Sequence, residues 1–141
     1  EEEKKIMRAH ISDSFSHVSP VIDTDRILKA RQLVKQVYID ERIEQYIADI
    51  VFATRYPEQY KLKDFKNYIS FGGSPRASIN LALAARACAF IKRRGYVVPE
   101  DVREVAADVL RHRIGLSYEA EASDIKADDI VKEILNKVEV P

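Results

Sequence analysis

The sequence predicts an all-α fold: a helical bundle of about five helices, with at most a minor two-stranded β patch. Several stretches place apolar residues at helical spacing, and the breaks between them hold residues typical of helix starts and stops. The chain has 141 residues, enough for one ordinary domain with a buried core. We therefore expect one bundle with a short segment attached at its N-terminus.

The N-terminal part is predicted to be separate from the bundle. Residues 1–12 are typical of a short helix with acidic residues in its first turn. Residues 14–23 are expected to be a linker, because serines, a histidine and Pro20 interrupt the helical pattern. We place the division at residue 20, so that residues 1–20 are a helix and linker and residues 21–141 are the bundle.

Two amphipathic helices come next. The first is expected to be capped by Thr24 or Asp25 and to end at Tyr38 and Ile39. The second is expected to begin at Asp40 and to stop before Pro57, and it has the clearest helical pattern, with apolar side chains at Ile43, Tyr46, Ile47, Ile50 and Val51. A polar connection over residues 58–71 carries five apolar or aromatic side chains: Tyr60, Leu62, Phe65, Tyr68 and Phe71. They could pin the connection to the bundle, which we favour, or form an exposed apolar surface that binds a partner.

A central helix is predicted from Ser74 to Gly95. Ser74 is a good N-cap because its hydroxyl can accept from a free backbone N–H, and Pro75 suits the first helical position. Gly95 is expected to stop the helix. The residues between are apolar on nearly every side, so we expect neighbours to cover the helix most of the way round, with four large side chains in the core: Ile79, Leu83, Phe90 and Ile91.

The C-terminal part adds two helices. One begins at Pro99 with acidic residues in its first turn, although Val98 before it cannot cap, which should cost about 1 kcal/mol. The last begins near Asp128 and has a clear inner face. Between them, residues 114–118 alternate in character and could form a brief strand that pairs with residues 138–141.

Arg76 is the unusual residue of the central helix. A cation in a first turn faces the positive end of the helix dipole, which is unfavourable by about 0.3–1 kcal/mol, whereas an anion is welcome there. Gly72 and Gly73 provide a backbone that a phosphate can approach closely. The residues alone leave two interpretations open: Arg76 meets an external phosphate, or it pairs with a carboxylate of a neighbouring helix.

Five segments in one order resemble the C-terminal lid of MoxR-type AAA+ ATPases. They are Gly73-Ser74-Pro75-Arg76-Ala77 with its alanine-rich helix, residues 96–102, residues 109–113 and residues 116–121, and the resemblance covers nearly the whole chain. Residues 1–12 resemble the helix that leaves the AAA+ core. The sequence departs from its relatives at Val98, where they usually have threonine.

The resemblance implies a role in an ATP-driven machine. Arg76 matches the sensor-2 arginine, which contacts the γ-phosphate of ATP, and Gly73, Ser74 and Pro75 would lie beside it. The implied cofactor is ATP, with Mg²⁺ held by the core domain. The implied partners are that core, neighbouring subunits of a hexameric ring with chaperone-like activity, and proteins with von Willebrand factor A domains. Arg55 is a candidate second cation facing the core, although a solvated surface arginine is the simpler interpretation.

The chain itself lacks the parts that hydrolyse ATP. It contains no Gly-x-x-x-x-Gly-Lys-Ser/Thr motif, and no apolar strand ends in paired acids that could hold Mg²⁺. We therefore expect it to be inactive alone and to complete a site built elsewhere. A stand-alone helical adaptor that binds protein through the aromatic loop is the alternative.

Composition argues against several other classes of function. Lys and Arg together number 23, as do Asp and Glu, so the totals do not favour nucleic acid, and only Lys92–Arg94 with Arg111–Arg113 would support such binding. The three histidines lack metal-ligand spacing, and no apolar run approaches a bilayer's thickness. The single Cys88 excludes disulfides within the chain and favours a reducing cytoplasm. The role of Arg111, His112 and Arg113 is left open.

Overall fold

The computed structural model describes residues 1–11 and 19–141. Residues 14–18 of the predicted linker therefore lie outside the described residues, and residues 19–23 of it belong to no helix or strand. The chain divides into two compact units, Glu1–Ala30 and Arg31–Pro141, whereas the predicted division at residue 20 stays a prediction. No helix in the described part is long and apolar enough to span a bilayer.

The first unit contains α1 (Glu2–Ile11) and the beginning of α2 (Thr24–Val34). Asp23 caps α2, and not Thr24 or Asp25 as predicted, because the Asp23 carboxylate accepts from the backbone N–H of Arg26 at 2.7 Å. The helix ends at Val34, four residues before the predicted end at Tyr38. Val37 then lies in the core of the second unit, and the backbone N–H of Tyr38 donates to the carbonyl of Gly95.

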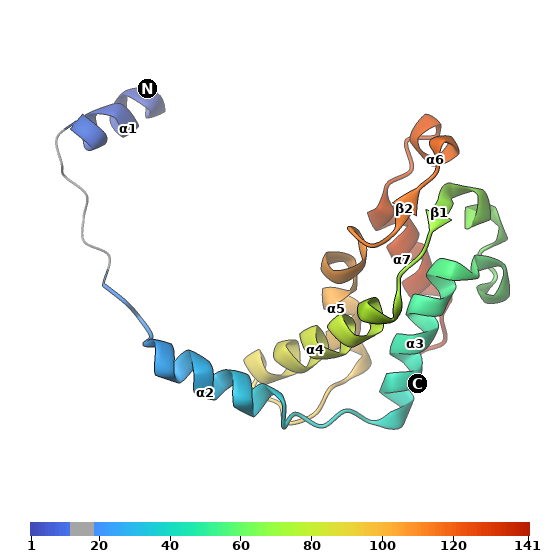
Figure 1. The fold of residues 1–141 in the computed structure, drawn as a ribbon, viewed down its shortest axis with the longest axis horizontal. Coiled ribbons are helices and arrows are strands. Elements are labelled where there is room, and N and C mark those ends of the chain that lie inside the picture. The colour runs from blue at the N-terminus through green and yellow to red at the C-terminus, as the bar shows by residue number, and fades with distance from the viewer. Residues whose placement is uncertain (12–18) are drawn as a thin grey trace. The chain divides into compact units, whose positions relative to one another are not determined.

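The second unit is the predicted helical bundle with a small sheet (Figure 1). Its elements follow the chain in the order α3 (Glu41–Arg55), η1 (Pro57–Tyr60), η2 (Lys63–Tyr68), β1 (Ile69–Phe71), α4 (Pro75–Ile91), α5 (Pro99–Leu110), β2 (Gly115–Leu116), α6 (Tyr118–Ala122) and α7 (Ala127–Lys137). Helices α4 and α5 pack against each other, and α3 and α7 complete the core. The all-α class with a minor β patch is confirmed.

Helix α3 follows its sequence pattern closely. Asp40 caps it by accepting from the backbone N–H of Arg42 at 3.0 Å, and Pro57 follows its end. Its predicted inner face is buried: Ile43, Tyr46, Ile47, Ile50 and Val51. The pattern was informative here because one face of α3 meets the core while the other is polar.

The aromatic connection is largely pinned to the bundle, as expected. It forms two short 3₁₀ helices, η1 and η2, and Leu62 between them is buried. The Tyr60 hydroxyl donates to Asp49 of α3 at 2.9 Å, and Phe65 and Tyr68 pack against the core. Phe71 is the exception, because it is 65% exposed.

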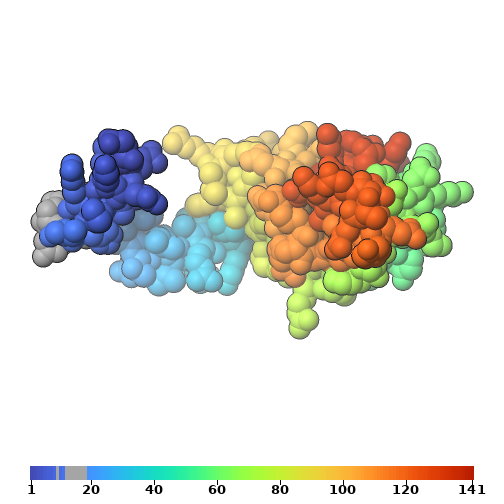
Figure 2. Space-filling model, turned by 90° about the horizontal axis from the view of Figure 1, so that it is seen from above, coloured from blue at the N-terminus to red at the C-terminus, as the bar shows by residue number. Residues whose placement is uncertain are grey.

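The predicted strand pairing was wrong. Strand β2 pairs antiparallel with β1, at the end of the aromatic connection, and not with residues 138–141. Val138 is buried in the core at the end of α7, so its side chain is used in packing there. The Ser117 hydroxyl donates to the Asn67 carbonyl at 2.5 Å and ties α6 to η2, whose orange and green surfaces adjoin in Figure 2.

The prediction for α4 was wrong on which side chains are buried. The helix buries a row of mostly small residues: Ala77, Leu81, Ala85, Cys88 and Ala89. Three of the large side chains expected in the core are exposed, Ile79 by 59%, Leu83 by 48% and Ile91 by 77%, and only Phe90 packs against it. Ile79 and Leu83 lie on the side of the helix opposite the buried row, and Ile91 is its last residue, so the described residues cover one face of α4 and not the other.

The end of α4 also differs from the prediction. The helix ends at Ile91, and the residue with a left-handed backbone is Arg93, at φ 60°, not Gly95. The backbone N–H of Arg93 donates to Phe90 and that of Arg94 to Ala89, both at 2.9 Å. This is the Schellman arrangement with arginine at the position that usually holds glycine.

Candidate functional site

The residues singled out by the sequence lie together at the start of α4. Ser74 takes the N-cap position with an extended backbone, at φ −78° and ψ 172°, and Pro75 is the first helical residue. The backbone N–H of Ala77 donates to the Ser74 carbonyl at 2.7 Å. The Ser74 hydroxyl makes no capping hydrogen bond, so it leaves the first N–H groups of the helix open to another acceptor.

Arg76 lies in this first turn with an exposed side chain. The first turn of α4 contains no acidic residue. Within the described part of the chain, no carboxylate lies within 4.0 Å of its guanidinium group. The internal ion pair that the sequence left open is therefore not formed among these residues, and helix start and guanidinium together form a positively charged site.

The two glycines before Ser74 are held against α3. A Cβ atom on Gly72 would lie 2.4 Å from the carbonyl oxygen of Thr54, which is impossible without moving the backbone. The backbone N–H of Gly73 donates to the Thr54 hydroxyl at 2.8 Å. Neither glycine has a positive φ, so glycine is needed here for close approach to α3.

Arg55 lies beside the same loop. It lines a polar pocket of about 200 Å³ together with Gly72 and Lys66, and its guanidinium carbon stacks over the Phe52 ring, 4.4 Å from the ring centre. Its Nε atom is buried and has no hydrogen-bond partner among the described residues. Arg55 is thus a partly buried cation and not the solvated surface arginine that was the simpler interpretation.

Lys92, Arg93 and Arg94 form a basic cluster at the end of α4, and carboxylates of α5 pair with two of them. Asp101 of α5 is fully buried, and Arg94 holds it with two hydrogen bonds of 2.5 and 2.6 Å. Lys92 pairs with Glu104 and, at 3.4 Å, with Asp101. Hydrogen bonds to these carboxylates raise the pKa of Lys92, so it stays charged. Two of the three cations of this cluster are therefore engaged internally.

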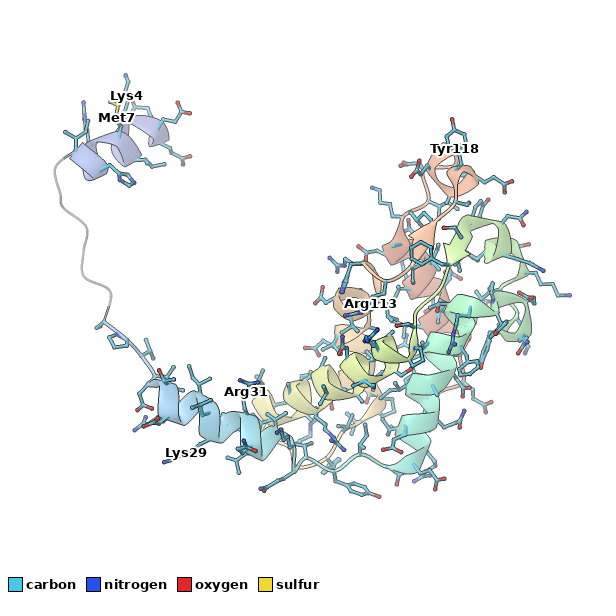
Figure 3. All side chains as sticks on the ribbon, viewed as in Figure 1. Lys4, Met7, Lys29, Arg31, Arg113 and Tyr118 are labelled. Carbon is cyan, nitrogen blue, oxygen red and sulfur yellow. The ribbon has the colours of Figure 1, made fainter. Side chains whose placement is uncertain are left out.

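The second basic cluster is only partly explained. Arg111 pairs with Asp108 at 2.8 Å and with Asp128 at 3.2 Å, both near the surface. Arg113, labelled in Figure 3, has a buried Nε atom without a hydrogen-bond partner among the described residues. Tyr118, also labelled there, is exposed and projects away from the protein. His112 is exposed. Within the described part of the chain, no hydrogen bond or ion pair joins Arg111, His112 or Arg113 to the first turn of α4.

Sequence reasoning missed the two residues that organise the ends of α4. Among the described residues, Thr54 and Asp101 are the buried polar or charged ones. A signal for Thr54 exists, because it lies four residues after Ile50 on the apolar face of α3, where a polar side chain needs a partner. Asp101 sits at the third position of its helix, where a carboxylate reaches back to the N-cap.

Comparisons with known proteins agree on one family. Residues 63–134 match the AAA lid domain family, about half of the chain. Chaperone MoxR1 of Mycobacterium tuberculosis is 38% identical over 121 residues, covering 86% of this chain and 32% of that protein. Protein YeaC of Bacillus subtilis, which is uncharacterised, is 37% identical over 130 residues, covering 92% of this chain and 38% of that protein.

A crystal structure of a candidate ATPase from Cytophaga hutchinsonii has the same fold. It is 43% identical, with a TM-score of 0.87, and the match covers 99% of this chain and 42% of that one. The chain thus spans roughly a third to two fifths of the length of these relatives. The chain belongs to the AAA lid domain family and is of the type found in MoxR AAA+ ATPases.

Proposed function

We propose that this chain is the sensor-2 lid of a MoxR-type ATPase, and that Arg76 contacts the γ-phosphate of ATP bound to a P-loop domain outside the chain. The observation that carries the proposal is the exposed guanidinium at a helix start that has no acidic residue in its first turn. Gly73, Ser74 and Pro75 would lie beside the phosphate, with Mg²⁺ held by the P-loop domain. A triphosphate fits this site, because both the helix dipole and Arg76 favour an anion.

The same contact can couple nucleotide state to movement of the lid. A hydrogen bond to a charged group contributes about 1.5–3 kcal/mol, which changes an equilibrium between two lid orientations by about 10- to 150-fold. Arg76 supplies this energy only while the γ-phosphate is present, so hydrolysis releases the lid. This change in lid orientation would drive chaperone-like remodelling in a hexameric ring. Proteins with von Willebrand factor A domains would be further partners, and the machine would act in the cytoplasm.

The test is Arg76→Ala in the full-length protein that contains this lid. We expect ATP turnover to fall by about 10- to 100-fold, because the transition state loses a charge-assisted contact. Arg93→Ala is the matched control, since Arg93 is also an exposed arginine, at the other end of α4. Circular dichroism should show both variants folded, and normal turnover in folded Arg76→Ala protein would refute the proposal.

No specific observation favours the adaptor alternative. The aromatic connection that would bind a partner has Leu62 buried and Phe65 and Tyr68 packed on the core. The mass of the endogenous polypeptide separates the two functions, because an adaptor would correspond in length to this chain whereas a lid would be joined to a P-loop domain.

A further inference from the structure

Thr54 is a fully buried hydroxyl beside the candidate phosphate site. It lies in the last turn of α3 and is 0% exposed, and most of the other buried residues of that helix are apolar. A buried polar group is tolerated when its hydrogen bonds are made, so the partners of Thr54 show what the residue is for. These partners lie in two different elements.

The Thr54 hydroxyl makes one hydrogen bond in each direction. It donates to the carbonyl of Val51 in its own helix at 2.6 Å, and it accepts from the backbone N–H of Gly73 at 2.8 Å. Donation within α3 fixes the hydrogen, which leaves a lone pair directed at the loop. Valine has the same shape but neither function, whereas serine has both.

The backbone of the loop at Gly72 and Gly73 also packs closely against the last turn of α3. A Cβ on Gly72 would lie 2.4 Å from the Thr54 carbonyl oxygen, and a Cβ on Gly73 would lie 3.3 Å from Val51. The loop therefore rests directly on the last turn of α3 through Gly72 and is held there by the bond to Gly73. Arg76 follows three residues later, in the first turn of α4.

We propose that Thr54 is a positioning residue for Arg76. Its hydroxyl fixes where α4 begins relative to α3, and thereby where the guanidinium group of Arg76 stands when the lid closes. This rests on the proposed contact between Arg76 and the γ-phosphate. Loss of the hydroxyl should weaken recognition of the γ-phosphate specifically, because the rest of the nucleotide is bound by the P-loop domain.

The experiment uses the full-length protein with Thr54→Val and Thr54→Ser. Dissociation constants are measured for ADP and for a non-hydrolysable ATP analogue. We expect Thr54→Val to weaken analogue binding about five- to tenfold while ADP binding changes less than about twofold, as for loss of one hydrogen bond. Thr54→Ser should restore the preference for the analogue. Ser70→Ala is the control, because it removes a neighbouring hydroxyl that donates to Leu116 at 3.0 Å.

A double-mutant cycle separates positioning from general support of the fold. If Thr54 acts through Arg76, Thr54→Val should not reduce analogue binding further in an Arg76→Ala background. Equal weakening of ADP and analogue binding, or additive effects in the cycle, would overturn the proposal. Should Thr54→Val fold poorly, Gly72→Ala displaces the loop from the same point of α3 and should cause the same selective loss.

The outcomes also distinguish this inference from the proposed function. If Arg76→Ala lowers the preference for the analogue and folded Thr54→Val does not, positioning by Thr54 is wrong and the contact of Arg76 stands. If Arg76→Ala leaves the preference unchanged, the proposed contact itself is wrong. Hydrogen exchange of residues 71–77 in Thr54→Val should rise, and unchanged exchange would show that the hydroxyl does not hold the loop.

Discussion

The starts of α4 and α5 have the same backbone design and opposite charges. Each helix begins with proline after an extended residue, Ser74 at ψ 172° and Val98 at ψ 161°. In α5 the third helical residue is Asp101, whose carboxylate accepts from the backbone N–H of Val98 at 3.1 Å and binds Arg94. In α4 the second helical residue is Arg76, which has no acidic partner in the described part of the chain.

The difference separates a structural charge from one available for binding. Asp101 is fully buried and satisfies the helix dipole, the N-cap backbone and a neighbouring cation from within the protein. Arg76 is exposed and opposes its helix dipole. Removing the first charge should therefore damage the fold, and removing the second should affect only what binds there.

The largest effect is expected for Asp101→Ala. It leaves Arg94 without its carboxylate and the N-cap of α5 without its acceptor, so the free energy of unfolding should fall by about 3 kcal/mol. Arg76→Ala should change it by less than about 0.5 kcal/mol. Urea unfolding of the 141-residue chain measures both.

Asp108→Ala is the matched control for the first change. Asp108 lies on the same helix and pairs with Arg111, but its side chain is 76% exposed, so its loss should cost less than about 1 kcal/mol. If Asp101→Ala were no more destabilising than Asp108→Ala or Arg76→Ala, the contrast between the two helix starts would be wrong.

Acid should weaken the start of α5 selectively. Burial by itself would raise the pKa of Asp101, but hydrogen bonds from Arg94 and the Val98 backbone outweigh it and lower the pKa from 3.8 to about 2. The ionised carboxylate therefore contributes fully above about pH 4, and this contribution, about 1–2 kcal/mol, is lost as the pH falls towards about 2.

The check is urea unfolding at a series of acidic pH values, with Asp101→Asn for comparison. Asparagine does not titrate, so the stability difference between wild type and variant should shrink between about pH 4 and pH 2. A constant difference across this range would mean that the pKa of Asp101 is not lowered by folding.

The smallest expected effect tests whether the backbone N–H groups in the first turn of α4 are free to bind an anion. Ser74→Asp adds a capping acceptor and a negative charge at a helix start where the Ser74 hydroxyl makes no cap, so stability should rise by about 0.5–1 kcal/mol. In the full-length protein the same carboxylate should weaken ATP binding by repulsion. Ser74→Asn caps without charge, so it should stabilise without that loss, and equal ATP binding by both variants would argue against a phosphate at this site.

Whether the sequence predicts the buried face of a helix depends on whether its apolar residues lie on one side only. The faces of α3 and α7 could be predicted because each has one apolar and one polar side. The faces of α4 could not, because its sequence is apolar all round, and exposed Ile79 looks the same in the sequence as buried Leu81. The partner of β2 was also missed, because residues 69 and 116 are far apart in the chain.

At the candidate site, too, local features could be predicted from the sequence and contacts between distant segments could not. Helix capping chemistry located the start of α4 at Ser74 and Pro75, because those preferences are local to a few residues. The role of Thr54 could not be predicted, because it depends on packing between α3 and a loop 19 residues away. Glycine at position 72 was explained by phosphate approach, whereas contact with the Thr54 backbone already requires it.

The amino-acid sequence by itself determined four helices of the bundle, α3, α4, α5 and α7, with their approximate starts, and the place of an arginine in the first turn of α4, because these follow from neighbouring residues and helix periodicity. Only the tertiary structure decided which charges are used internally. Arg94 and Arg76 are both arginines near an end of α4, yet one is held by a buried carboxylate and the other is exposed. That distinction depends on which side chains of distant segments come within hydrogen-bonding distance, and local sequence does not contain this information.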